Sequence, residues 1–132
     1  MRDFATVFVY GSLLKGLSNH RTLGESPFLG ESRIRGFRMI DLGAFPGLVY
    51  GKSEIKGEVY SVDSETLSRL DELEGNGRFY TRELTGTASG SAWVYVLPTE
   101  TYGRHREVPD GDWRKYKTEQ DALSRERYYA GC

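Results

Sequence analysis

The stretch Thr6-Val7-Phe8-Val9-Tyr10-Gly11-Ser12-Leu13 decides how the fold of this chain begins. Its first five residues are β-branched or aromatic and a glycine follows them, which predicts a buried strand that ends in a sharp turn. Successive amides after such a glycine can form a nest that binds a carboxylate. The same pattern also fits an ordinary turn, and the glycine spacing matches neither a phosphate loop nor a dinucleotide fingerprint.

Further short apolar runs follow along the chain, among sixteen glycines and nine tyrosines. Strands are predicted at residues 33–42, 48–50, 55–62, 80–84 and 91–97. So many strands in 132 residues favour an α+β fold with a mixed, mostly antiparallel sheet. Curling of that sheet into a small β-barrel flanked by helices would remove its exposed edges. The length suits a single domain over residues 1–132.

The residues after this run of strands predict a helix. Asp63 suits an N-cap, Gly75 suits a C-terminal stop, and Leu67, Leu70 and Leu73 form an apolar stripe between them. A second helix is predicted for residues 119–129, after Thr118 as its cap, although this segment is polar on nearly every side.

Charge and cysteine content exclude several classes of protein. The formal net charge is −1, from 18 basic and 19 acidic residues mixed along the chain, so we expect no nucleic acid or anionic membrane as partner. Cys132 is the only cysteine, which excludes an internal disulfide and favours a reducing compartment. The apolar run at residues 4–10 is too short for a transmembrane helix. We therefore expect a cytoplasmic protein whose partner is a small molecule, and the sequence gives no indication of its oligomeric state.

Metal and nucleophile chemistry find little support in the sequence. His20 and His105 are the only histidines and are expected at the surface, so no metal or other cofactor is predicted. A terminal cysteine is a poor nucleophile because chain ends are seldom held rigidly. Ser12 lacks the pattern of a nucleophile elbow.

Glu74 is the residue that breaks the local rules of the first predicted helix. A rotation of roughly 100° per residue puts it roughly 20° from Leu67 and 40° from Leu70, inside the apolar arc, whereas Glu72 falls on the other side. Burial and the negative end of the helix dipole both disfavour an ionised carboxylate there, so its pKa should rise. A raised pKa suits proton transfer near neutral pH. The competing interpretation is a surface glutamate at a frayed helix end.

Five blocks of the sequence, taken together, resemble the gamma-glutamyl cyclotransferase-like family. The resemblance covers roughly the first 97 residues. The blocks are Val9-Tyr10-Gly11-Ser12-Leu13 with Gly16 and Asn19, Phe45-Pro46-Gly47-Leu48-Val49, Lys56-Gly57-Glu58-Val59-Tyr60, Leu70-Asp71-Glu72-Leu73-Glu74-Gly75, and Phe79-Tyr80-Thr81-Arg82.

The resemblance implies a compact α+β fold around a small β-barrel and an enzyme that needs no cofactor. In such enzymes the α-amine of a gamma-glutamyl substrate attacks its own γ-carbonyl, which gives 5-oxoproline and a free amine. Glu74 matches the proposed acid/base catalyst. Tyr10, Gly11, Ser12 and Leu13 match the backbone cradle for the glutamyl group. Tyr80 resembles a tyrosine of the same cavity, and its hydroxyl is expected to bond either Glu74 or the substrate, unless it merely packs within a strand.

The resemblance fades after Leu97. Trp113 and Tyr116 are similar to a Gly-Asp-Trp patch near the end of some members, and this variable region is expected to shape how the leaving amine is accommodated. Free gamma-glutamyl amines, gamma-glutamyl dipeptides, an isopeptide product and a glutamylated natural product all remain possible substrates. Two other functions stay open: a non-catalytic module that binds a small ligand in the same cavity, and an interaction protein that acts through its C-terminal segment.

Overall fold

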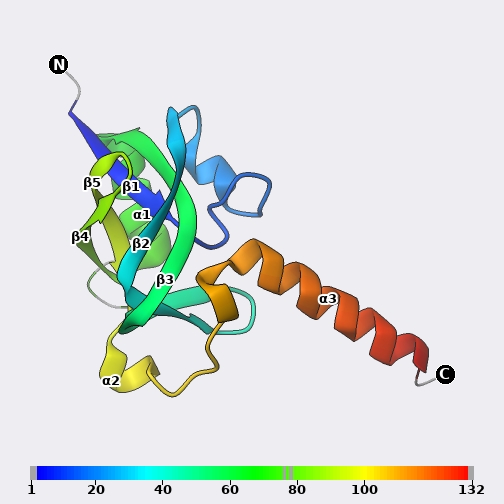
Figure 1. Cartoon of the computed structure of the whole chain (residues 1–132). Coiled ribbons are helices and arrows are strands. Elements are labelled where there is room, and N and C mark those ends of the chain that lie inside the picture. The colour runs from blue at the N-terminus through cyan, green and yellow to red at the C-terminus, as the bar shows by residue number, and fades with distance from the viewer. Residues whose placement is uncertain (1–2, 76, 78, 131–132) are drawn as a thin grey trace.

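The structure is a computed structural model that describes residues 3–75, 77 and 79–130. Five strands and three α-helices make up most of this part of the chain (Figure 1). The strands are β1 (Phe4–Val9), β2 (Phe28–Asp41), β3 (Pro46–Asp63), β4 (Thr81–Thr87) and β5 (Gly90–Val96). The helices are α1 (Ser64–Glu74), α2 (Thr99–Tyr102) and α3 (Trp113–Ala130), with 3-10 turns at His20–Leu23 and Pro109–Gly111. Cys132 lies outside the described residues.

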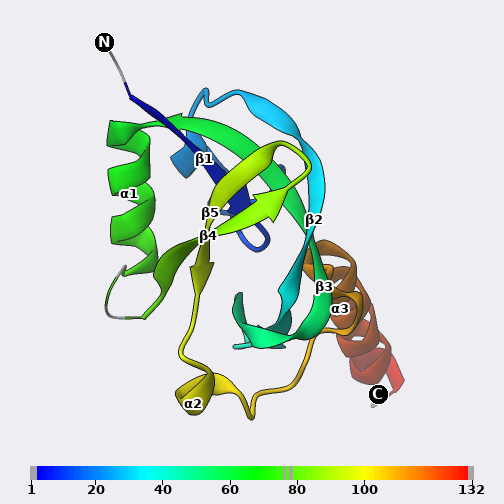
Figure 2. The same ribbon diagram turned by 60° about the vertical axis from the view of Figure 1, so that its left-hand side comes forward.

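The strands form one curled sheet in the order β2-β3-β1-β5-β4. All neighbours are antiparallel except β1 and β5, which are parallel. The sheet wraps around its own interior while α1 lies against its outer side (Figure 2). Its two edges approach where the Ala88 amide donates to Ser32 Oγ at 3.0 Å. The fold is thus the predicted mixed sheet in the form of a curled half-barrel.

Strand β3 is longer than the sequence predicts. The separate strands expected at 48–50 and 55–62 are one continuous strand that pairs with β2 from Phe28 to Asp41. The polar residues between them interrupt the apolar pattern, yet the ladder continues through them. Register shifts around Phe37 mark a bulge, and bulges bend and twist a strand without ending it.

Both faces of β1 are buried because the strand lies in the middle of the curled sheet. Phe8 and Tyr10 belong to the cluster inside the curl, whereas Val7 and Val9 belong to the cluster under α1. This alternation explains why the stretch contains an unbroken run of apolar residues.

Helix α1 begins and ends where the sequence predicts. Asp63 Oδ1 accepts a hydrogen bond from the Thr66 amide at 2.8 Å, and Gly75 adopts a left-handed conformation with φ of 60°. The buried side of the helix differs from the predicted apolar stripe at one position: Leu70 is fully buried, but Leu73 is 45% exposed.

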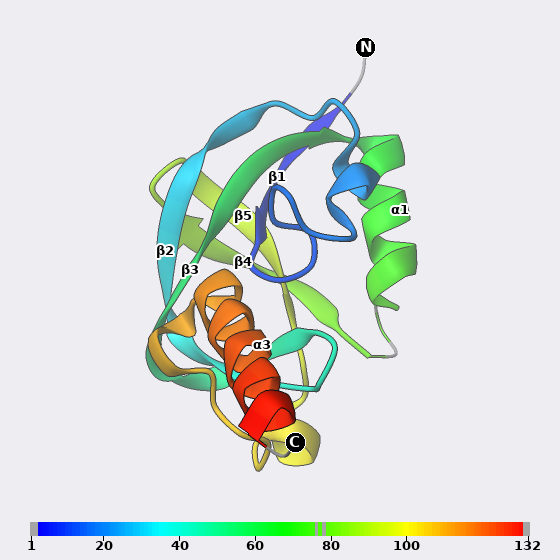
Figure 3. The same ribbon diagram turned by 90° about the vertical axis from the view of Figure 1, so that its right-hand side faces the viewer.

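Helix α3 begins six residues before the predicted start. The Lys115 amide donates to Asp112 Oδ1 at 3.1 Å, so Asp112 and not Thr118 supplies the cap. Thr118 lies inside the helix. Trp113 and Tyr116 are buried in the core, and the rest of the helix projects away from the sheet (Figure 3). None of the helices that the structure describes combines the length and apolar character needed to cross a membrane.

Candidate active site

A cavity of about 480 Å³ opens beside the end of β1. This volume lies in the range of about 300–1,000 Å³ that is usual for small-molecule sites. The residue expected to be catalytic and the five expected to bind substrate all line it, namely Glu74, Tyr10, Gly11, Ser12, Leu13 and Tyr80. The lining residues are Phe8, Val9, Tyr10, Gly11, Ser12, Leu13, Asn19, Leu42, Phe45, Pro46, Leu73, Glu74, Phe79, Tyr80, Tyr95, Leu97 and Tyr102.

A glycine is required at position 11, at the end of β1, because the Pro46 ring leaves no space for a side chain. A Cβ atom built on it would lie 2.8 Å from Cγ of Pro46, closer than real side chains approach. Its φ is not among the positive values found for nine other glycines, so the expected glycine-only backbone conformation is not the reason for this residue. The close approach brings the loop after β1 against the start of β3.

The loop after β1 directs its carbonyl groups toward its own backbone. The Gly11 carbonyl accepts from the Leu14 amide at 3.0 Å, and the Ser12 carbonyl accepts from the Asn19 amide at 2.9 Å. Asn19 Nδ2 also donates to Ser12 Oγ at 2.8 Å. No hydrogen bond from the Ser12 or Leu13 amide is found among the described residues. These two amides are therefore available to an anionic ligand, as the predicted cradle needs.

Glu74 ends α1 and is half-buried at the cavity wall, whereas Glu72 is exposed. Burial raises the pKa of the Glu74 carboxyl from 4.5 to about 7. The direction of this shift is the one that the helical geometry predicts. The carboxyl can consequently give or accept a proton near neutral pH.

The two cavity tyrosines use their hydroxyl groups to hold the walls together. Tyr10 Oη donates to the Tyr95 carbonyl at 2.7 Å, and Tyr80 Oη donates to the Pro46 carbonyl at 2.8 Å. The expected hydrogen bond from Tyr80 to Glu74 is absent from this geometry, and the tyrosine lies just before β4 and not inside it. Burial first, and then the nearby Glu74 charge, raise the pKa of Tyr80.

A polar cluster behind the cavity was missed from the sequence. Asp71 Oδ1 accepts from Arg82 Nε at 2.8 Å and from Tyr95 Oη at 2.7 Å. The Arg82 guanidinium also lies 4.5 Å from the centre of the Trp93 ring. Arg82 therefore braces β4 against α1. Beyond its place in the strand predicted at residues 91–97, no signal in the sequence assigned Tyr95 to this cluster.

Apolar side chains surround the mouth of the cavity. They come from the β2–β3 loop, the end of α1, the loop after it and α2, and they are Leu42, Phe45, Leu73, Phe79 and Tyr102. Phe45 and Phe79 are 47% and 62% exposed, respectively, so the mouth presents aromatic surface to a ligand. Of the region after Leu97, Tyr102 lines the cavity, whereas Trp113 and Tyr116 pack in the core and do not line it.

Neither histidine lines the cavity. His20 is half-buried, with Nδ1 2.9 Å from the Leu13 carbonyl, and its ring packs against Tyr60; the expected surface position holds only for His105. Among the residues that the structure describes, no three His, Cys, Asp or Glu side chains gather as metal ligands would.

The fold and site together define a class of small α+β proteins in which a curled sheet, a helix and a glycine-containing loop enclose one ligand-sized cavity. Residues 7–115 match the family model described as "Gamma-glutamyl cyclotransferase, AIG2-like", and the chain belongs to this family.

Relatives and solved structures agree with this membership. The chain is 38% identical over 107 residues to the gamma-glutamylcyclotransferase family protein YtfP of Escherichia coli strain K12, covering 81% of this chain and 94% of that protein. It is 34% identical over 122 residues to a Niallia circulans protein named gamma-L-glutamyl-butirosin B gamma-glutamyl cyclotransferase, covering 84% and 76%. A crystal structure of an uncharacterized protein from Pyrococcus horikoshii superposes with a TM-score of 0.78 at 32% identity, covering 89% and 97%.

Proposed function

We propose that this protein is a cyclotransferase that cleaves a gamma-glutamyl amide to 5-oxoproline and a free amine, with Glu74 as acid/base catalyst. One observation carries the proposal: a carboxyl group whose pKa is raised to about 7 lines the same cavity as the loop Gly11–Leu13. Family membership supports the reaction type, since the matched model is described by that activity.

The glutamyl group is oriented by its own charges in this proposal. Its α-carboxylate binds the amides of Ser12 and Leu13, which have no acceptor among the described residues. Its α-amine then lies on the side of Glu74. Nucleophile and electrophile belong to one molecule, so the site has to fold the substrate and move protons, and it needs no separate protein nucleophile.

Glu74 serves both proton transfers of the reaction. Its carboxylate takes a proton from the attacking α-nitrogen as that nitrogen forms a bond to the γ-carbonyl carbon. The bond from this carbon to the leaving nitrogen then breaks, and Glu74 returns the proton to the departing amine. No water is consumed. A pKa of about 7 suits a group that alternates between base and acid near neutral pH.

The mouth of the cavity favours an amine without a carboxylate as the leaving group, so the substrate is a gamma-glutamylamine. Glu74 is the one charged side chain among the described lining residues. A carboxylate on the leaving group would therefore be buried near a negative group among apolar side chains, which is unfavourable. The Niallia circulans relative is itself named for gamma-L-glutamyl-butirosin B.

A pair of substrates that differ by one carboxylate tests this proposal. We expect gamma-glutamylphenethylamine to give 5-oxoproline with a kcat/KM at least about 10-fold above that of gamma-glutamylphenylalanine. Equal or reversed preference would contradict the amine assignment while leaving the reaction type intact. Calorimetric binding of both compounds without any 5-oxoproline would instead support the non-catalytic module.

A further inference from the structure

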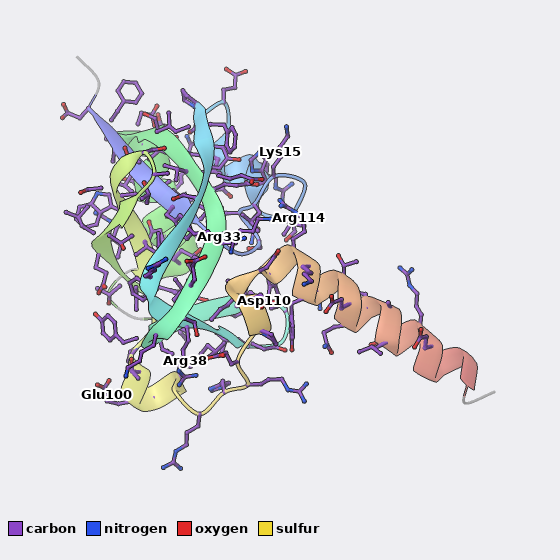
Figure 4. All side chains as sticks on the ribbon, in the orientation of Figure 1. Lys15, Arg33, Arg38, Glu100, Asp110 and Arg114 are labelled. Carbon is purple, nitrogen blue, oxygen red and sulfur yellow. The ribbon has the colours of Figure 1, made fainter. Side chains whose placement is uncertain are left out.

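The backbone of Lys15, in the loop after β1, is held by hydrogen bonds on both sides of its Cα atom. Its amide donates to Glu58 Oε1 at 2.9 Å, and its carbonyl accepts from Arg114 Nη2 at 2.7 Å. Figure 4 shows Lys15 in this loop directly above Arg114 at the start of α3. Residues far apart in the sequence thus fix the two peptide groups that flank Lys15, two positions beyond Leu13.

Glu58 is a buried charge with a complete set of partners. It lies on β3 with 6% of its surface exposed, where it pairs with Val9 at the end of β1. Besides the Lys15 amide it accepts from Tyr60 Oη at 3.0 Å and from Arg114 Nη2 at 3.3 Å. A buried carboxylate that accepts several hydrogen bonds is held in one position, because each broken bond leaves a charge desolvated.

Arg114 is held in turn by the first turn of α3. Its neighbours Trp113 and Tyr116 are buried in the core, and Tyr116 Oη donates to Asp41 Oδ2 at 2.7 Å. The family match ends at residue 115, so it includes Arg114 but leaves out the part of α3 that projects from the body. The first turn of the helix therefore has a contact role that the rest of the helix does not share.

We propose that Glu58 and Arg114 are positioning residues that hold the Lys15 backbone, and through it the Ser12 and Leu13 amides, in the orientation that binds the glutamyl carboxylate. Neither residue lines the cavity. They act on substrate binding through the loop, and they take no part in proton transfer. We call the contacts of Glu58 and Arg114 with the Lys15 backbone the clamp. The effect of the clamp on catalysis rests on the proposed function, whereas the clamp itself is defined by these contacts alone.

Arg114→Ala is the variant that tests the clamp. The Arg114 side chain is 42% exposed, so its removal should leave the protein folded, and Glu58 keeps its hydrogen bonds from Lys15 and Tyr60. We expect KM for a gamma-glutamyl amide to rise about 10-fold while kcat changes less than about threefold. Arg114→Lys retains a cation that can donate to both oxygens, so its KM should fall between wild type and Arg114→Ala.

The matched control is Lys117→Ala, which removes a cation from the next turn of the same helix. Lys117 pairs with Asp121 at 3.9 Å on the surface, and this variant should have wild-type KM and kcat. A loss of kcat at constant KM in Arg114→Ala, or an equal KM effect in both variants, would overturn the proposal.

Amide hydrogen exchange gives a readout that does not depend on turnover. We expect the Lys15 amide to exchange at least about 10-fold faster in Arg114→Ala than in wild type, with the β1 amide of Phe8 unchanged. Unchanged exchange at Lys15 would overturn the clamp. If wild type makes no 5-oxoproline from any gamma-glutamyl amide, the proposed function fails, and the exchange result still decides whether the clamp exists.

Discussion

Glu74 is the residue at which local stability and the proposed chemistry conflict. A carboxylate at the C-terminal end of α1 faces the negative end of the helix dipole, and burial adds to the cost by raising its pKa to about 7. A lysine would stabilise this helix end. Proteins retain such unfavourable groups mainly where the perturbed group has a function.

The raised pKa has a consequence for stability. The folded state binds the Glu74 proton more tightly than the unfolded state, whose pKa is near 4.5. The charge therefore costs nothing below about pH 4.5, and its cost grows as the pH rises to about 7 and stays above it. Glu74→Gln avoids this cost, so it should raise the free energy of unfolding at pH 8 by on the order of 1–3 kcal/mol and change it little at pH 4.5. Thermal unfolding at both pH values measures this, and an identical Tm difference at the two would contradict it.

A second prediction at the residue scale concerns Gly11. Gly11→Val forces a side chain against the Pro46 ring, where even a Cβ atom would lie 2.8 Å from Cγ. We expect a loss of on the order of 1–3 kcal/mol in the free energy of unfolding and weaker binding of a gamma-glutamyl compound by calorimetry. Gly86→Val is the control, because nothing lies within 4 Å of its added Cβ. Unchanged ligand affinity in Gly11→Val would argue that the loop does not bind substrate.

At the scale of elements, α1 carries Glu74 and depends on its N-cap for its position. Asp63→Ala removes the acceptor for the Thr66 amide, which typically costs about 1 kcal/mol. Urea unfolding should therefore have a lower midpoint for Asp63→Ala than for Asp121→Ala, an exposed carboxylate within α3. Equal midpoints would mean that the cap does not stabilise the helix.

The elements that could be predicted from the sequence are those specified by local pattern. The run into Gly11 identified β1, and Asp63 with Gly75 delimited α1, because apolar spacing and caps act within a few residues. The start of α3 was missed because Thr118 was taken as its cap, whereas Asp112 supplies it. That Trp113 and Tyr116 begin this helix becomes evident only once the core that buries them is known.

Which residues line the candidate site could be predicted in part from the sequence, but their contacts could not. The place of Glu74 at the cavity wall follows from helical rotation, and its raised pKa follows from burial. The hydrogen bond from Tyr80 to the Pro46 carbonyl joins residues 34 apart, and that from Lys15 to Glu58 joins residues 43 apart. No local pattern encodes such contacts, since they depend on how the sheet curls.

At the scale of the whole molecule, the cavity exists because separate segments meet around the end of β1. The loop after β1, the β2–β3 loop, the end of α1 and the strand β5 each contribute to its lining. Curling of the sheet brings them together, with α1 on the outside to present Glu74. In the proposed chemistry the sheet therefore positions the lining segments, and the carboxyl group of Glu74 transfers the protons.

The measurement that tests this account most directly is the turnover of a gamma-glutamyl amide by Glu74→Gln, with Glu72→Gln as the control on the exposed face of the same helix. Glutamine keeps the shape and most hydrogen bonds but cannot exchange a proton, so kcat should fall at least about 100-fold while substrate affinity changes little. Glu72→Gln should retain wild-type activity. Full turnover in Glu74→Gln, or loss of activity in Glu72→Gln alone, would contradict the assignment of Glu74 as the acid/base catalyst.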